Sequence, residues 1–380
     1  MKTFKIIISL SLLLFFFCPK VLANEEALKE EASIYEKQFE ISGAGELGET
    51  LSEETKNLLN ELGIDPSSYQ SLSAPSVKSF FKVILNCLLN GIKEPFKVLI
   101  SSVGIILIFS LINAGVPSSE FFGGYNIFLT LILSAIILVP LSSVIDVTAE
   151  ALKGLSAFLT VFVPVLAGIL SAKGYALTAG GMQTAVLTVS QFMSHFVSLL
   201  LVPITKAITC LGLCGSLSSL LGLEKFCALI KNGILWCFGT ASAIFLSIIS
   251  MQTAVSAATD STALRTSKSI VGGLIPVMGP LISESLSVAG GCLNVLKTGV
   301  GIYGILALLL SVLPVLTSLI CFKGAMVVSL SVAELFCISE AVSLFRIIDF
   351  CLSVLIGSTV FILLVYIISF GTVLKTGGAA

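Results

Sequence analysis

The sequence is poor in charge and in the side chains that most enzymes use. Charged residues make up only 11% of the 380 residues, and the chain has one histidine and one tryptophan. A soluble domain carries about 25% charged residues. The low charge content excludes a soluble globular protein, a disordered protein and a DNA-binding protein. Hydrophobic residues make up 56% and the mean hydropathy is +1.07, which predicts an all-α polytopic integral membrane protein.

The motifs of nucleotide-driven and hydrolytic chemistry are missing as well. The sequence has no Walker A motif, no GxGxxG in a βαβ context, no HExxH and no Ser-His-Asp pattern. Its ten cysteines include no CxxC pair, and with a single histidine they form no zinc pattern. We therefore expect no enzymatic activity, no metal and no cofactor.

The N-terminus has the layout of a secretory signal peptide. Lys2 and Lys5 precede an apolar run over residues 6–17, and small residues end at Ala23. This order predicts a signal peptide over residues 1–23 with cleavage after Ala23. The alternative is an uncleaved first anchor. Both interpretations place the following residues outside the cytoplasm.

Residues 24–75 form an acidic segment with twelve acids against three lysines. Thr50 and Glu53 have capping-box spacing, and Gly63 would end the short helix that follows. Asp65-Pro66 then predicts a turn. We expect either a weakly structured, solvated extracytoplasmic linker or a docking segment for an extracytoplasmic partner.

Residues 76–95 have the pattern of an amphipathic helix. Lysine and asparagine lie on one face, and Phe81, Leu85 and Leu88 lie on the other. A helix of this kind lies in the membrane interface or packs on the outer rim of a helix bundle.

The rest of the chain, residues 96–380, is predicted to be a multi-span transmembrane domain. Apolar runs of about 20 residues are typical of membrane spans. The predicted spans are 96–114, 125–145, 151–172, 182–204, 233–250, 299–322, 325–345 and 350–374. Residues 207–223 would add a ninth span or a re-entrant piece, so we expect eight or nine transmembrane helices after the signal peptide.

A proline-centred sequence pattern occurs twice in the chain. Pro164-Val165-Leu166 and Pro314-Val315-Leu316 are each followed by a Lys-Gly pair at the same distance, 150 residues apart. Apolar sequence also matches itself by chance. A duplicated unit with a Pro-broken helix would favour a stand-alone secondary transporter or permease.

Residues 251–298 are the least membrane-like part of this domain. The polar and helix-breaking residues there that we consider candidates for lining or assembly are Asp260, Arg265, Lys268, Pro276 and Gly279. Irregular backbone at membrane depth requires cover from protein or a water-filled cavity. The alternative to such a re-entrant element is a surface loop with an amphipathic helix.

Two further polar residues lie inside predicted spans. His195 lies in span 182–204 and Glu334 in span 325–345. An intramembrane ionisable residue is a candidate for conduction, proton relay or assembly. A lone histidine is more often hydrogen-bonded to a neighbouring helix.

The sequence from Asp260 to Ile302 resembles the stage III sporulation protein AE family. The similar residues are Asp260 to Lys268, then Ile275-Pro276-Val277-Met278-Gly279, then Lys297 to Ile302. Ser261 stands where that family typically has glycine. The order of signal peptide, short polar segment and many spans also agrees along nearly the whole chain.

The resemblance implies a non-enzymatic membrane subunit of a sporulation-specific, channel-like transenvelope complex. Such a subunit would lie in the mother-cell membrane around the forespore of an endospore-forming bacterium. The partners that the resemblance implies are membrane proteins of the same operon and a forespore-side protein. The composition separately predicts contact with membrane lipid and no nucleic acid, and the small Lys and Arg bias between the two sides of the predicted spans makes a membrane insertase a further expected partner.

Overall fold

The computed structural model describes most of the chain from residue 47 onward. The described residues are 39, 47–65, 67, 68, 71, 77–115, 122–172, 175–216, separate short helical stretches between 225 and 259, and 279–376. The predicted signal peptide lies outside them. Within these ranges the structure is helical and contains no strand.

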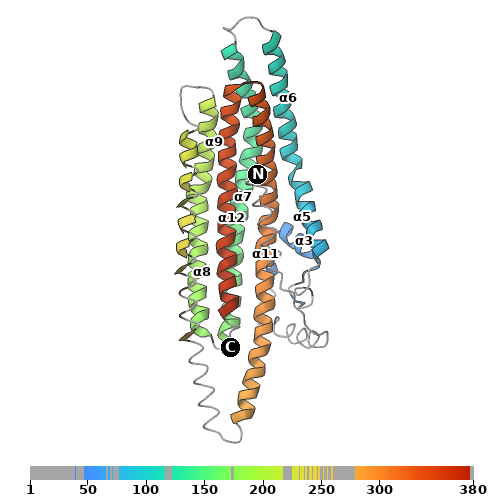
Figure 1. Cartoon of the computed structure of the whole chain (residues 1–380). Helices are drawn as coiled ribbons and strands as arrows, with labels where there is room; N and C mark the ends of the chain where they lie inside the picture. The colour runs from blue at the N-terminus through green and yellow to red at the C-terminus, as the bar shows by residue number, and fades with distance from the viewer. Residues whose placement is uncertain are drawn as a thin grey trace.

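Most of the helices labelled in Figure 1 are long and run side by side in one elongated bundle. They are α3 (Glu53–Glu61), α5 (Val77–Gly91), α6 (Lys93–Gly115), α7 (Phe122–Ala172), α8 (Ala176–Phe196), α9 (Val202–Ser216), α11 (Gly279–Leu335) and α12 (Ser339–Thr376). Six helical stretches in the described part are long and apolar enough to cross a membrane. The all-α membrane fold is therefore confirmed, while the count of eight or nine spans stays a prediction.

Helices α7 and α11 are far longer than single predicted spans. They contain 51 and 57 residues, or about 76 and 85 Å at 1.5 Å per residue. The predicted spans 125–145 and 151–172 both lie inside α7, so the expected break between them is wrong. The helix continues because residues 146–150 contain no glycine or proline that would end it, and Asp146, at the expected break, is paired with Lys206 of α9.

The prolines of the repeated spacing do not break their helices. Pro164 lies inside α7 and Pro314 inside α11, and both helices are continuous. The proposed Pro-broken repeat is thus absent from these two helices. A local change does occur before Pro203, where residues Val197–Leu201 form a π-helical turn between α8 and α9. Proline cannot donate the helical hydrogen bond, and a wider turn relieves the resulting mismatch.

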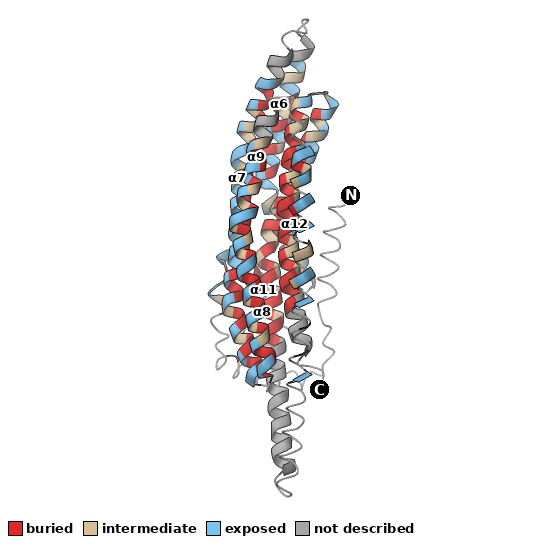
Figure 2. Cartoon of the chain, turned by 90° about the vertical axis from the view of Figure 1, so that its left-hand side faces the viewer, coloured by how far each residue is buried: buried red, intermediate tan, exposed pale blue. Residues whose placement is uncertain are grey.

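Helices α11 and α12 form an antiparallel hairpin at the centre of the bundle. Figure 2 shows buried residues concentrated along them, and α11 contacts α12, α7, α6, α5 and α3. The chain reverses at residues 336–338, where Cys337 has φ 54° and the Ile338 N–H donates to Ala333 C=O over 3.1 Å. The predicted span 325–345 is therefore wrong, because this turn divides it.

The acidic segment is ordered where the structure describes it. Helix α3 ends at the positive-φ residue Gly63, as predicted, but its N-cap is Ser52 rather than Thr50. The Ser52 hydroxyl accepts from the Thr55 N–H, so the expected capping box is wrong. The leucines of α3 are buried against the bundle, and the Thr55 hydroxyl donates to Ser311 Oγ of α11 over 3.3 Å. Residues 47–65 are thus a docked element and not a solvated linker.

Helix α5 packs on the outer rim of the helix bundle, which is one of the two predicted alternatives. Its Val83 and Cys87 are buried, and it contacts α11 and α3. It continues into α6 with only Ile92 between them, and Phe81 and Leu85 remain exposed.

Part of the predicted re-entrant region is regular helix. Residues 279–298 belong to α11, so they form neither a loop nor a re-entrant turn. The other alternative, a surface loop with an amphipathic helix, stays a prediction for the region as a whole. Gly279 begins the helix and Pro280 follows in its first turn, where no intrahelical N–H is required.

Candidate functional site

Charged side chains gather at one height of the bundle, and we call this group the charged layer. Its members are Lys93, Glu94, Lys97, Asp146, Glu150, Lys153, Lys206, Lys323 and Asp349. Three observations place them together. The Lys206–Asp146 pair joins α9 to α7, the Lys323–Asp349 pair joins α11 to α12, and a single cavity is lined by residues of α5, α6, α7 and α11.

The most enclosed charges in this layer are Lys323 and Asp349. Lys323 Nζ lies 2.5 Å from Asp349 Oδ1 and 2.6 Å from Ser353 Oγ, and it also contacts Asp349 C=O at 3.4 Å. The side chains are only 15% and 24% exposed. The ammonium thus has three oxygen partners, which compensates for much of its desolvation. This pair links α11 to α12 inside the bundle.

The other pairs of the charged layer are at the surface. Lys206 Nζ lies 2.7 Å from Asp146 Oδ1, and Lys97 Nζ lies 2.6 Å from Glu94 Oε1. Their side chains are between 45% and 71% exposed. Exposed charges are costly in hydrocarbon. The charged layer therefore belongs in water or among lipid headgroups, or against another protein.

Two apolar regions flank the charged layer. The upper region, in the view of Figure 1, consists of residues 98–115 of α6 and 122–145 of α7; the α11–α12 turn, with its Glu334–Arg346 pair, also lies toward this end of the bundle. The lower region consists of residues 154–172, 176–205, 298–322 and 350–374. Neither region contains Asp, Glu, Lys or Arg. Each of these stretches is long enough, at 1.5 Å per residue, to cross most or all of a hydrocarbon core of about 30 Å.

The predicted site residues that the structure describes, Gly279, Glu334 and His195, lie apart from this layer. Asp260, Arg265, Lys268 and Pro276 lie outside the described residues, and Gly279 lies at the start of α11. Glu334 lies in the last turn of α11, where its Oε1 accepts from Arg346 Nη2 of α12 at 2.9 Å. His195 is exposed near the end of α8. Among the predicted residues that the structure describes, none contacts another.

The charged layer was not predicted from the sequence, because the residues of its interhelical pairs lie in the gaps between predicted spans. A signal was present, since Asp146, Lys206, Lys323 and Asp349 each interrupt or border an apolar run. The signal could not show that they meet, because the partners are 60 and 26 residues apart. Within the described ranges, no three His, Cys, Asp or Glu side chains converge as a metal site would require.

Comparison with known proteins gives a consistent family result. The family model described as stage III sporulation protein AE matches residues 69–377. Stage III sporulation protein AE of Bacillus subtilis (strain 168) is 26% identical over 165 residues, which is 43% of this chain and 41% of that relative. The aligned stretch thus spans less than half of the relative. No solved structure matches the chain.

Proposed function

Since the chain belongs to the stage III sporulation protein AE family, and is therefore a sporulation protein, we propose that it is a non-enzymatic membrane subunit of a channel-like transenvelope complex. Its proposed place is the mother-cell membrane around the forespore. Its proposed partners are other membrane proteins of the same operon, a forespore-side protein and, during insertion, a membrane insertase.

The observation that carries this proposal is the excess apolar length of α7. This single helix of 51 residues is about 76 Å long and has an apolar region on each side of the charged layer. A hydrocarbon core of about 30 Å accommodates only one of these two regions. The large apolar side chains exposed on α7 include Phe128 in the upper region and Val147 in the charged layer.

The apolar side chains of a region that lies outside the hydrocarbon core must be shielded from water by something other than lipid. Large exposed apolar surfaces are typical of protein interfaces. The upper region exposes Leu107, Leu111 and Phe128, while the lower region exposes Leu177 and Leu199 of α8 and the π-helical turn. Whichever region lies in lipid, the other leaves apolar side chains that only protein can cover. A subunit of a complex meets this requirement through its partners.

The alternative of a stand-alone secondary transporter has less support. Its main argument was a Pro-broken repeat, and Pro164 and Pro314 lie within continuous helices. In that repeat Lys323 would correspond to Lys173, but Lys323 is a mid-helix residue paired with Asp349. No described feature favours coupled transport.

The test is an affinity purification of the tagged, full-length protein from sporulating cells in mild detergent. We expect stoichiometric recovery of other sporulation membrane proteins. A variant Arg265→Ala should remain in the membrane and lower spore yield, because we propose an assembly or lining role for the 260–279 block. Recovery of the intact protein alone, together with ion-coupled uptake in liposomes, would reject the complex and support the transporter.

A further inference from the structure

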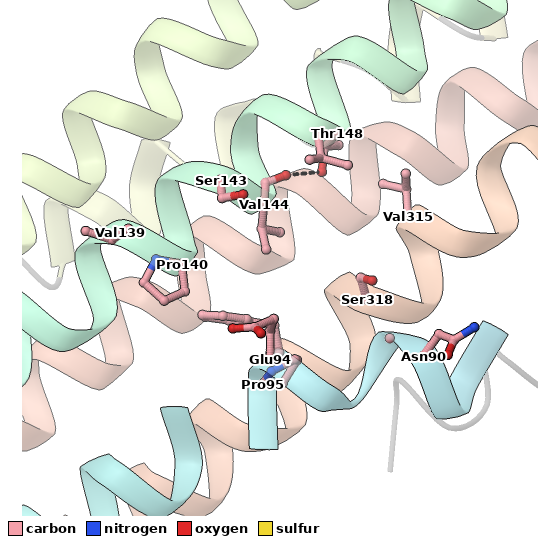
Figure 3. Close-up of a pocket in the computed structure, with 13 residues that line it drawn as sticks. Asn90, Glu94, Pro95, Val139, Pro140, Ser143, Val144, Thr148, Val315 and Ser318 are labelled. Atoms are coloured by element: carbon pink, nitrogen blue, oxygen red, sulfur yellow. Dashed lines mark hydrogen bonds between the residues drawn. The ribbon is translucent and has the colours of Figure 1, made fainter. Parts of the chain in front are cut away.

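A cavity of about 370 Å³ opens within the charged layer, between α5–α6, α7 and α11 (Figure 3). This volume lies in the range of sites for small molecules and lipid headgroups. Most of its lining is apolar. The polar side chains in the lining are Asn90, Glu94, Ser143, Thr148 and Ser318.

Helix packing and two prolines shape this cavity. At Gly91, α5 approaches α11 so closely that an added Cβ would lie 3.2 Å from the Ser318 backbone nitrogen. Next to this contact, Pro95 and Pro140 line the cavity from α6 and α7. Pro95 has no N–H to donate to Gly91 C=O, four residues earlier. A helix carbonyl in the cavity wall thus lacks its usual i+4 donor.

The charge in the cavity lining is negative and the charge at its rim is positive. Glu94 is the charged residue among the lining residues, while Lys93 and Lys97 flank it on α6. The Glu94–Lys97 pair has an i,i+3 spacing and is exposed, with side chains 68% and 71% exposed. An exposed pair of this kind is worth only about 0.2–1 kcal/mol. A second cation can therefore share the Glu94 carboxylate at little cost.

Apolar side chains continue from the cavity onto the surface of α7. Val139 and Val147 both line the cavity and are both more than half exposed. A carboxylate with adjacent hydrogen-bond acceptors, two neighbouring ammonium groups and an apolar track together complement one class of molecule. That class has an ammonium, a phosphate and acyl chains.

We propose that this cavity binds the headgroup of a phospholipid that carries a primary ammonium, such as phosphatidylethanolamine. The lipid ammonium donates to the Glu94 carboxylate and to Gly91 C=O. The phosphate lies near Lys93 and Lys97, and an acyl chain follows Val139 and Val147 of α7. A lipid bound in this way ties the charged layer to the headgroup region of the bilayer and fills the space between α6 and α7.

The test uses the full-length protein in mild detergent, equilibrated with equal amounts of phosphatidylethanolamine and phosphatidylglycerol. Native mass spectrometry measures the lipids that remain bound. The wild-type protein should retain phosphatidylethanolamine preferentially. Glu94→Gln should lower its retention roughly tenfold, the usual scale for loss of a charge-assisted hydrogen bond. Retention of phosphatidylglycerol should not fall with it.

The matched control is Glu53→Gln on α3, because Glu53 also forms an exposed i,i+3 pair, with Lys56 at 2.7 Å. This variant should bind lipid like the wild type. Ser143→Leu, which fills the cavity, should also lower phosphatidylethanolamine retention while the protein elutes normally from size exclusion. Equal retention of both lipids by the wild type, or the same retention in Glu94→Gln and Glu53→Gln, would overturn the proposal.

Discussion

Gly304 of α11 lies directly against an aromatic ring of α7. A Cβ added there would lie 2.1 Å from Phe162 Cζ, and Phe162 is fully buried and stacked on Phe158 at a ring-centroid distance of 5.3 Å. The ring therefore has little room to move. We predict that Gly304→Ala destabilises the protein by about 1–3 kcal/mol, measured as a lower thermal midpoint in detergent.

The control for this change is Gly168→Ala in α7, where an added Cβ meets nothing within 4 Å. It should leave the midpoint unchanged or raise it, because alanine favours helix. Phe162→Leu combined with Gly304→Ala should recover part of the loss. A wild-type thermal midpoint for Gly304→Ala would show that α7 and α11 are further apart than this contact implies.

The Lys323–Asp349 pair allows a second prediction at the residue scale. Lys323→Met leaves a largely buried carboxylate without its cation, which costs roughly 3 kcal/mol. Lys323→Met combined with Asp349→Leu should restore most of the stability, because an apolar pair carries no desolvation penalty. Thermal midpoints of the two variants test this expectation.

The comparison for that pair is Lys97→Met, which removes an exposed partner of Glu94. Its effect should be within about 1 kcal/mol. If Lys323→Met is equally mild, Asp349 has access to water and the pair does not hold α11 against α12.

At the scale of elements, the docking of α3 is the feature most open to direct test. Thr55 Oγ1 and Ser311 Oγ are 3.3 Å apart, across 256 residues of sequence. We predict that the double variant Thr55→Cys, Ser311→Cys forms a disulfide on mild oxidation, detected as a cross-linked peptide by mass spectrometry. A disulfide brings two side-chain sulfurs into direct contact, and the side-chain oxygens at these two positions are already in contact.

The control pairs Glu53→Cys with Ser311→Cys, because the Glu53 side chain is 83% exposed. That variant should give far less cross-link. Equal yields from both variants would indicate that α3 is not held on α11 through Thr55.

The elements that the sequence predicted well depend on local chemistry. Gly63 ended α3 as expected, because a positive φ at a helix end is a property of that residue alone. The amphipathic helix that starts at Val77 follows from side-chain spacing in the same way. The elements predicted poorly depend on distant partners. No local pattern shows that Asp146 is paired with Lys206, so a helix of 51 residues was read as two spans.

The site was less predictable than the fold for a related reason. Glu334 was expected at mid-span, but it lies in the last turn of α11 and is paired with Arg346. The turn that changes its role places the non-glycine Cys337 at φ 54°, and cysteine carries no turn signal in the sequence. The charged layer likewise depends on the alignment of five helices, which composition does not encode.

At the scale of the whole molecule, the charged layer predicts where water or headgroups reach the bundle. Val147 of α7 is 51% exposed and lies beside Asp146. We predict that Val147→Cys in membrane vesicles is labelled by a water-soluble maleimide, because exposed charges exclude this level from hydrocarbon.

The comparison variants are Phe128→Cys in the upper apolar region and Leu177→Cys in the lower region. The native side chains at these positions are 65% and 56% exposed. At least one of them should remain unlabelled, which identifies the region in lipid. Labelling at both positions but not at Val147→Cys would place the charged layer inside the bilayer and contradict its assignment.

The contact between Thr55 and Ser311 also has a consequence for biosynthesis. At roughly 5–20 residues per second, about 13–51 s pass between the synthesis of these two residues. Helix α3 therefore leaves the ribosome before every helix it packs on and is buried only after α11 has been made. During that interval Leu58, Leu59 and Leu62 lack the surface that covers them in the finished protein. Any factor that binds α3 during translation competes with α11 for the same leucines. The rate at which that factor releases α3 then limits how soon α3 packs on α11.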